Sequence, residues 1–597
     1  MMSSKWLLLA AILPATLAWT PTPEEIAADN ENSRLVNDTA LTWACIIAVL
    51  LAYTWTLKLL HHVRRIVNFG HGDADTANQL YFATTNETWA RFKRHWLIAP
   101  LFRTRHMRES KLSAAMNMGT LPSRIQTFWL LCYFALNTAT AVVKIHWHMG
   151  RVVWLNDLCN RTGTLATLNL IPLFLLAGRN NPLIWLLDIS FDNYNLLHRW
   201  IGRMVVVQAF LHGAFWIAEQ AVESGWSSVA PELAVPGSMQ LTGTIGIGAF
   251  IVILFQSPSV VRHAFYETFL HVHILLVLFS VVVIWLHLEG CTQQTLLIAA
   301  VVCWVVERLI RVYLLIRNNL HRGVTKAEVE VLPGDAVRIT LRLARPWKFN
   351  PGQHVYLYLP SVGIWTSHPF TIAWSQELDH WRGGEKALPL ARQDMLTTKS
   401  TSMSLVVRRR TGFTDRLYTK AARDIGNRFT ATALVEGPYG GKTFRSYGTV
   451  MLFAAGVGIT HQVPQVRDLL LASANGTCAT RKIVLVWIVQ SPEHLEWVRP
   501  WMTEILGMHK RREVLRIMLF VTRPRSTKEI HSPSASVQMF PGKPNVAALV
   551  EQEQTSQVGA MAVSCCGTGS LSDDLRKAVR ERCEFTEIDF SEESFSW

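Results

Sequence analysis

The sequence predicts a bundle of seven membrane-spanning helices followed by a soluble part that combines an antiparallel β-barrel with a parallel α/β sheet. Half of the 597 residues are hydrophobic and only 17% are charged, whereas a soluble protein normally carries about 25% charged residues. The 23 tryptophans are typical of a chain with many membrane–water interfaces, where indole rings concentrate. Near residue 322 the long apolar runs give way to short β-like runs separated by turns, which places the soluble part after the bundle.

The first 18 residues predict a cleavable signal peptide, because Lys5 precedes an apolar core and a small-residue ending. Residues 19–40 are then a short outside segment that carries the glycosylation sequon Asn37-Asp38-Thr39. Seven apolar spans follow, each near the roughly 20 residues that a membrane helix needs. They cover residues 41–60, 126–145, 164–178, 196–217, 241–256, 266–287 and 295–316.

The net charge of +14 is explained by membrane orientation and does not require a nucleic-acid partner. Residues 61–125 hold ten Lys and Arg against four Asp and Glu, which is the asymmetry of a cytosolic loop. The predicted bundle at 41–317 has seven spans, and an odd number of spans puts its two ends on opposite sides of the membrane. Since the basic loop is cytosolic, the N-terminus lies outside and the soluble part lies in the cytosol. The plasma membrane is the expected location, and the vacuolar membrane is the alternative.

Four histidines on two of the spans share one spacing. His198 and His212 are fourteen residues apart, as are His273 and His287. Fourteen steps of about 100° return to within about 40° of the same helix face, roughly 21 Å further along the axis. His271 would point about 160° away from His287, which favours His273 as the partner.

Two such helices side by side would present an inner pair, His198 with His273, and an outer pair, His212 with His287. Ionisable groups inside a membrane are costly and mark function. An imidazole nitrogen can bind haem iron, so each facing pair would hold one haem. The alternative is that these histidines lie at helix ends and extend toward the membrane surface.

These pairs, together with Phe265-Tyr266-Glu267 before the second helix, resemble the fungal ferric-chelate reductases, which belong to the wider family of NADPH oxidases and ferric reductases. The resemblance covers nearly all of the chain after the signal peptide. It implies two b-type haems, each held by two histidines, and a cytosolic module similar to ferredoxin–NADP reductase.

The FAD domain is expected at 322–436, where β-like runs include 326–331, 337–344, 354–359 and 404–409. Within it, His368-Pro369-Phe370-Thr371 resembles the flavin-binding motif of the family. Gly412 and Thr414 lie in a later turn, where a glycine allows the backbone to approach a pyrophosphate. Arg408–Arg410 would offset phosphate charge or form a solvated strand edge.

The NADPH domain is expected at 437–597 and begins with Gly437-Pro438. Strand-like runs at 450–454, 483–490, 517–522 and 560–564 alternate with helical stretches, which predicts a parallel sheet. The first run meets Gly456-Val457-Gly458-Ile459-Thr460, an arrangement that suits a phosphate because backbone amides and a helix N-terminus face it. Residues 523–545 read as a surface excursion.

The resemblance gives three further residues a role in hydride transfer. In the family a Cys-Gly, here Cys566-Gly567, lies near the nicotinamide, and a terminal aromatic residue, here Trp597, stacks on the flavin. A preference for NADPH over NADH follows from the resemblance only, because Val489-Gln490-Ser491 is neutral; Arg523 or Arg525 would then meet the 2′-phosphate.

The function that follows is transfer of electrons from cytosolic NADPH, through FAD and two haems, to ferric or cupric chelates outside, with a metal-uptake permease as a candidate partner. One alternative is an NADPH oxidase that makes superoxide, although that pattern usually shortens the second histidine spacing by one. The other is a receptor or transporter with a nucleotide-sensing domain.

Two cysteines and two histidines are predicted near the outer side of the bundle. Cys159 and Cys291 would lie outside, either paired or as separate thiols. His146 and His148 would either bind metal or belong to an interfacial belt.

Overall fold

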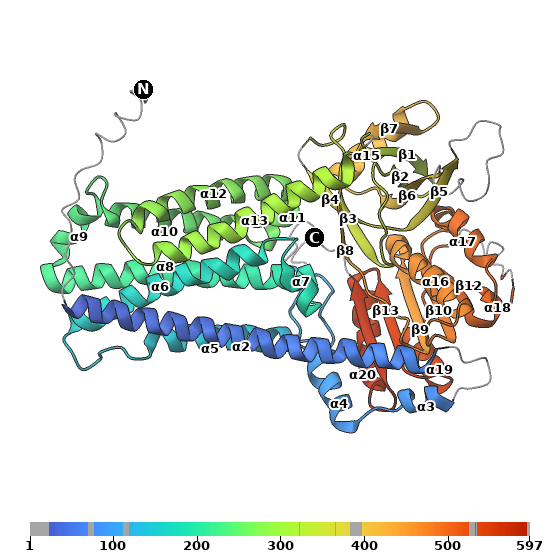
Figure 1. The fold of residues 1–597 in the computed structure, drawn as a ribbon, viewed down its shortest axis with the longest axis horizontal. Helices are drawn as coiled ribbons and strands as arrows, with labels where there is room; N and C mark the ends of the chain where they lie inside the picture. The colour runs from blue at the N-terminus through green and yellow to red at the C-terminus, as the bar shows by residue number, and fades with distance from the viewer. Residues whose placement is uncertain are drawn as a thin grey trace.

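The protein consists of an elongated helical part joined end-on to a part that contains the β-sheets (Figure 1). This computed structural model describes residues 23–69, 77–110, 119–321, 323–364, 366–381, 397–524, 532 and 534–593. The predicted signal peptide at 1–18, Arg525 and the terminal Trp597 lie outside the described residues.

Helices occupy all seven predicted spans, and five of them are long and apolar enough to cross a membrane. The other two, α6 and α13, carry charges that lower their hydropathy: Arg161 lies inside α6, and Glu307, Arg308 and Arg311 lie in the second half of α13. The seven are α2 (Pro23–Val67), α5 (Arg124–Val142), α6 (Arg151–Leu176), α8 (Phe191–Ser224), α10 (Met239–Gln256), α12 (Tyr266–His287) and α13 (Gln294–Asn319).

Polar side chains fix the packing of three of these helices at the middle of the bundle. The Asn169 amide on α6 donates to Asn137 on α5 at 2.6 Å and to Gln208 on α8 at 2.9 Å. Gln208 in turn donates to Asn137 at 3.0 Å, and all three side chains are buried. A closed network of this kind leaves few buried polar atoms unpaired, and it specifies one arrangement of the helices.

Two antiparallel sheets enclose the core of the predicted FAD domain. One has the strand order β5-β6-β2-β1-β7 and the other β4-β3-β8, and buried side chains from both, such as Ile339 and Leu357, fill the space between them. The strands are β1 (Lys326–Leu332), β2 (Ala336–Arg342), β3 (Gln353–Tyr358), β4 (Ser367–Thr371), β5 (Trp374–Trp381), β6 (Thr397–Arg408), β7 (Arg428–Thr432) and β8 (Leu434–Gly440).

A six-stranded sheet of order β12-β11-β10-β9-β13-β14 follows, and every pair in it is parallel. The sequence predicts its four central strands but not the edge strands, and β12 lies within the stretch expected to be a surface excursion. The strands are β9 (Thr449–Ala455), β10 (Lys482–Val489), β11 (Leu515–Val521), β12 (Val537–Pro541), β13 (Met561–Cys566) and β14 (Ile588–Glu593). The helices of this part include α16 (Ile459–Ala474), α17 (Arg499–Leu506), α19 (Val546–Thr555) and α20 (Gly569–Arg582).

The loop between the first two spans runs back over the parallel sheet instead of staying beside the helices. It contains α3 (Ala77–Ala83), α4 (Glu87–Phe92) and the π-helical turn Lys93–Leu97, and Figure 1 shows α3 and α4 beneath α20. The Lys93 ammonium is buried against β14, 2.9 Å from Glu587 Oε1 and 2.8 Å from Asp589 Oδ1. Burial works against the charge of Lys93, but these two carboxylates raise its pKa above the usual value.

A second anchor of the same loop lies at Asp573 on α20. Its carboxylate accepts hydrogen bonds from the backbone N–H groups of His106, Met107 and Arg108, at 2.8–3.1 Å. The loop therefore ties the helical part to α20 and to the edge strand β14 of the parallel sheet.

We predict that Lys93→Ala loosens this attachment, because it leaves two carboxylates without their buried cation. Breaking a buried ion pair costs about 3–5 kcal/mol, so backbone amides of β14 should exchange with solvent at least about a hundredfold faster. Hydrogen-exchange mass spectrometry measures this. Arg91→Ala removes an exposed pair with Glu87 on the same loop and should change exchange less than about threefold; equal effects would contradict the assignment.

Candidate functional site

Helices α8 and α12 bring the four histidines together as two facing pairs. The ring centres of His198 and His273 are 6.4 Å apart and those of His212 and His287 are 5.9 Å apart. Helix α10 packs against both α8 and α12, so the rings face each other across a gap that a third helix helps to define. We call His198 and His273 the proximal pair, since they lie toward the sheets, and the other two the distal pair.

The ring spacing fits one metal ion between each pair. A ring nitrogen lies roughly 1 Å from the ring centre and a metal about 2 Å beyond it, so two imidazoles on opposite sides of one metal have centres about 6 Å apart. Among the described residues, no group of three or more His, Cys, Asp or Glu side chains could hold a metal ion. Two-histidine coordination with the remaining ligands supplied by a porphyrin therefore suits these residues.

Hydrogen bonds orient three of the four imidazoles from the opposite side of the ring. The Nδ1–H groups of His198 and His212 donate to the carbonyls of Leu173 and Cys159 on α6, at 2.9 and 2.8 Å. His287 donates to the Met239 carbonyl at 2.8 Å. A proton held on Nδ1 leaves the Nε2 lone pair for a metal, as in most metal-binding histidines.

The fourth ligand candidate has a different neighbour. His273 Nδ1 lies 3.4 Å from the side-chain amide of Gln256 at the end of α10. His271, the competing candidate, is exposed and bonds to the Glu267 carbonyl of its own helix, so it does not face His198.

Two glycines make room for the distal rings. A Cβ atom at Gly163 on α6 would lie 2.8 Å from Nδ1 of His212, and one at Gly243 on α10 would lie 2.8 Å from Cε1 of His287. Both contacts are shorter than a carbon atom tolerates, so only glycine allows these rings to sit against the neighbouring helices.

Other side chains that the sequence analysis singles out near the distal pair do not form a metal site. No disulfide joins Cys159 to Cys291; the Cys159 sulfur lies instead 3.4 Å from His212 Nδ1. His146 Nδ1 is 2.8 Å from an oxygen of Asp157, which is a pair and not a cluster.

The residues expected to bind FAD come together at one edge of the barrel. His368, Pro369, Phe370 and Thr371 form β4, and the His368 ring stacks on Phe413 with centres 4.3 Å apart. Phe413 begins α15 (Phe413–Arg423), so Gly412 and Thr414 lie beside β4. Gly412 has φ of 72°, which favours glycine.

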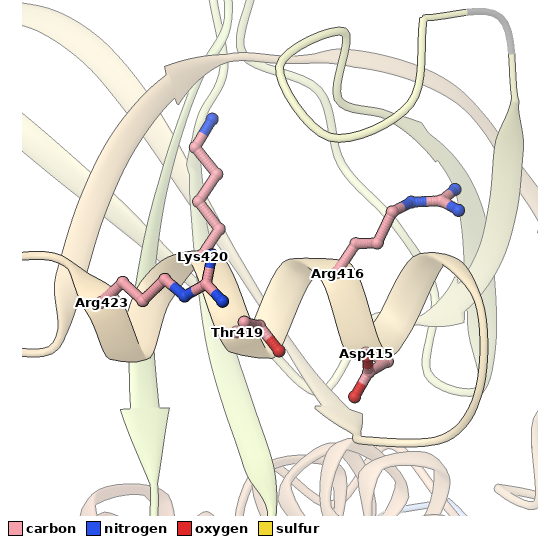
Figure 2. A pocket seen from close by; sticks show the side chains of 5 residues that line it. All are labelled: Asp415, Arg416, Thr419, Lys420 and Arg423. Atoms are coloured by element: carbon pink, nitrogen blue, oxygen red, sulfur yellow. The ribbon is translucent and has the colours of Figure 1, made fainter.

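A hollow runs along α15 next to these residues. Arg416, Lys420 and Arg423 project from the helix, with Thr419 between Arg416 and Lys420 and with Asp415 beyond Arg416 at the start of the helix (Figure 2). The three cations give the hollow a positive lining, which suits a phosphate-bearing group.

Most of the residues expected to bind NADPH meet at the carboxyl ends of β9 and β13. Gly437 and Pro438 do not: they lie on β8, in the antiparallel sheet with β3 and β4, so the expected domain boundary at 437 falls inside a strand of the barrel. The turn Gly456–Gly458 leads directly into α16, which begins at Ile459 and Thr460. A Cβ at Gly458 would lie 2.0 Å from the Cys566 carbonyl oxygen, and one at Gly567 would lie 2.7 Å from Ala455. The two motifs thus touch, as neighbouring parallel strands require.

The chemistry open to Cys566 is limited by its burial. The side chain is buried, and burial raises the pKa of its thiol well above the usual range. Burial therefore disfavours a thiolate nucleophile at Cys566, and its place beside a nicotinamide ring stays a prediction.

Sequence reasoning missed the junction between the helices and the sheets. Glu436 on β8 is fully buried, and its carboxylate accepts hydrogen bonds from Arg311 Nε at 3.0 Å and Arg179 Nη1 at 3.3 Å. The hydroxyls of Tyr358 and Tyr439 each donate to it at 2.8 Å. Arg179 follows α6 and Arg311 lies on α13, so one carboxylate fastens β8, where Gly437-Pro438 lies, to two helices of the bundle.

Comparison with known proteins gives matches in the same order along the chain. Residues 162–284 match the family of ferric reductase like transmembrane components, and residues 321–382 match an FAD-binding domain family. Residues 447–532 and 525–580 match the ferric reductase NAD binding domain family.

Curated relatives cover most of the chain. A probable ferric reductase transmembrane component of Candida albicans is 26% identical over 551 residues, covering 85% of this chain and 76% of its own length. A ferric/cupric reductase transmembrane component of Saccharomyces cerevisiae is 23% identical over 495 residues, covering 77% of this chain and 64% of its own length.

Among solved structures, a flavohemoglobin from Malassezia yamatoensis with bound FAD and heme shares 14% identity, with a TM-score of 0.31, over 74% of this chain and 96% of its own. A ferredoxin NADP+ reductase from Neisseria gonorrhoeae shares 12% identity, with a TM-score of 0.28, over 45% of this chain and 97% of its own.

We predict that the bundle holds two haems, and that Gly163→Ala and Gly243→Ala each displace one distal imidazole and lower this number to one. The haem-to-protein ratio, measured by the pyridine haemochrome spectrum, should fall from two toward one. Gly248→Ala is the matched control, because nothing lies within 4 Å of its Cβ position on α10. Unchanged haem content in both variants would show that the distal rings do not hold a haem.

Proposed function

Since the chain belongs to the fungal ferric reductase family, we propose that it reduces ferric chelates with electrons passed across a membrane from a reduced nicotinamide nucleotide. The observation that carries this proposal is the pair of facing imidazoles at each of two depths in one helical bundle. A receptor or transporter would not need them.

Three bound groups would supply the redox chemistry. Haem supplies one-electron chemistry in a layer that ions do not cross, FAD joins two-electron to one-electron chemistry, and NADPH supplies the hydride. His198 with His273 and His212 with His287 would hold the haems through Nε2.

The chain's own residues would position the two nucleotides. FAD would be held by His368–Thr371 together with Gly412 and Thr414. The cations along α15 would neutralise its phosphates. Backbone amides at Gly456–Thr460 would bind the pyrophosphate of NADPH, with Gly437, Pro438, Cys566 and Gly567 around its remaining parts. Trp597 would cover the flavin until the nicotinamide displaces it.

The preference for NADPH is supported by one contact at the ends of β10 and β11. The Arg523 backbone N–H donates to the Gln490 carbonyl at 3.0 Å, so the backbone of this basic residue lies beside the neutral turn after β10. A 2′-phosphate bound at this turn would meet the Arg523 guanidinium.

The acceptor that suits the distal pair is one that needs only an electron. Once Nε2 binds a metal, the Nδ1–H groups of His212 and His287 remain committed to backbone carbonyls. Neither ring then has a nitrogen free to deliver a proton, so the pair suits outer-sphere transfer of a single electron, as in the reduction of a ferric or cupric chelate.

The orientation follows from charge. The basic loop after α2 and the sheets would lie in the cytosol, and the distal pair would lie near the outside. The same proposal places the bundle in the lipid of the plasma membrane. It also includes a metal-uptake permease as the partner of the chain.

The direct test uses intact cells that express the chain and a membrane-impermeant ferric chelate. We expect reduction that depends on expression and that superoxide dismutase leaves intact. Loss of the signal with superoxide dismutase would instead identify oxygen as the acceptor and the chain as an oxidase.

We also predict that His212→Ala abolishes reduction at the outer surface while NADPH-driven reduction of a soluble dye by solubilised protein persists. The mutation removes one imidazole of the distal pair, whereas the nucleotide-binding residues lie on the sheets. His271→Ala is the control, because that exposed ring faces away from both pairs. A folded variant that loses both activities would contradict the proposed order of electron transfer.

A further inference from the structure

The loop between α2 and α5 carries an exposed turn beside the start of a membrane span. Phe102 and Arg105 form an antiparallel bridge, and the Arg105 backbone N–H donates to the Phe102 carbonyl at 3.2 Å. The Phe102 side chain is 63% exposed, and Arg103, Thr104 and Arg105 are exposed as well. Arg103 has φ of 35°, which is uncommon for a residue other than glycine. The turn therefore displays one large apolar side chain together with two cations.

Contacts on both sides hold this turn in place. Before it, Pro100 pairs with Ser123, the N-cap residue of α5. The first residue of α5 also donates its backbone N–H to the Ala99 carbonyl at 3.1 Å. After the turn, the backbone N–H of His106 donates to Asp573 on α20 at 3.1 Å. The exposed side chains thus belong to a segment that is fixed at the start of α5 and on the nucleotide-binding part.

The length of α5 fixes the depth of the turn in the membrane. Its 19 residues extend about 28 Å at 1.5 Å per residue, which nearly equals a hydrocarbon layer of about 30 Å. Ser123 therefore lies at the edge of that layer. Phe102 is two residues from Pro100, and two residues reach at most about 7 Å. Since the headgroup region adds about 5–8 Å on each side of the membrane, the turn lies in this region or at its margin.

An aromatic pair next to the turn agrees with this depth. The Trp96 ring centre lies 5.8 Å from that of Phe128, which is four residues, or about 6 Å, into α5. Trp96 is 43% exposed and Phe128 is 41% exposed. Half-exposed tryptophan at the end of a span is typical of the membrane–water interface. The surface around the start of α5 therefore suits lipid better than water.

The two cations of the turn have no acidic partner among the described residues. The Arg105 guanidinium donates to the Glu109 carbonyl at 3.3 Å, which uses one of its five N–H donors. Elsewhere on the same loop, Arg91 and Lys93 each pair with a carboxylate. Arg103 and Arg105 thus remain available for an anion that comes from outside the chain.

We propose that the Phe102–Arg105 turn binds an anionic phospholipid, with Phe102 inserted between lipids and Arg103 and Arg105 paired with the charged headgroup. A guanidinium pairs with a phosphate or carboxylate through two parallel N–H···O bonds. A basic side chain near an anionic membrane surface strengthens binding about fivefold. Anionic lipids concentrate in the cytosolic leaflet, which is the side where the proposed orientation places this loop.

The test uses the full-length chain in phosphatidylcholine nanodiscs that contain a small share of a photoreactive lipid. The reactive lipid is either phosphatidylserine, which is anionic, or phosphatidylcholine, which carries no net charge. Mass spectrometry of the digested protein then measures the labelling of residues 101–105. We expect phosphatidylserine to label this segment at least about tenfold more than phosphatidylcholine, and we expect high salt to reduce the difference because it screens the charges.

Variants separate the two parts of the proposed contact. Arg103→Gln and Arg105→Gln should each lower labelling by phosphatidylserine about fivefold and leave labelling by phosphatidylcholine unchanged. Phe102→Ser should lower labelling by both lipids alike, because it removes apolar contact and keeps both cations. Arg512→Gln is the matched control, since this exposed arginine lies on α18 (Arg511–Val514), at the end of the molecule away from the helices (Figure 1). Labelling of α12 in the same molecules is the reference for a folded bundle.

Two results would overturn the proposal. Equal labelling of residues 101–105 by the two lipids in the wild-type chain would mean that the arginines do not select an anionic headgroup. Labelling of the spans without any labelling of residues 101–105 would mean that the turn meets water or a protein partner. Neither measurement depends on haem or on chelate reduction, so these outcomes leave the proposed function untouched.

Discussion

The structure depends on two pairs of facing imidazoles, one ring of each pair on α8 and the other on α12. Each pair is held about 6 Å apart across a gap, because α8 and α12 are not packed on each other. Neighbouring helices maintain that spacing. Helix α6 supplies the carbonyls of Leu173 and Cys159 to the rings on α8, and α10 supplies the carbonyl of Met239 to the distal ring on α12. Gly163 and Gly243 let the same two helices approach closely enough to do so. The site is thus built by four helices, although only two of them carry the histidines.

A second constraint couples this site to the sheets. Glu436 would be an unfavourable buried charge on its own, but two arginines and two tyrosines from both parts of the molecule satisfy it. Such a group contributes less to stability than to specificity, because only one docking geometry pairs all of its partners. Since electron transfer depends steeply on separation, a rigid joint between flavin domain and bundle is what the proposed reaction needs.

The sequence was informative wherever a period or a spacing repeats. Apolar runs predicted all seven helices, the fourteen-residue spacing predicted which histidines face each other, and near-continuous apolar runs predicted the central strands β9, β10, β11 and β13. Edge strands such as β12 and β14 were missed because they are half-exposed and their composition resembles that of loops. The partners of Glu436 could not be found either, because they come from Arg179, Arg311 and Tyr358, which only the three-dimensional fold brings together.

The loop at residues 77–108 has a consequence for how the molecule can be divided. It supplies the cation for Asp589 on the edge strand β14 and for Glu587 just before that strand, and the amide donors for Asp573 on α20. A dehydrogenase fragment cut out after residue 321 would therefore leave these carboxylates without their buried cation, which is strongly destabilising. The nucleotide-binding half is not a detachable module: a stable soluble version would have to carry that loop as an added peptide.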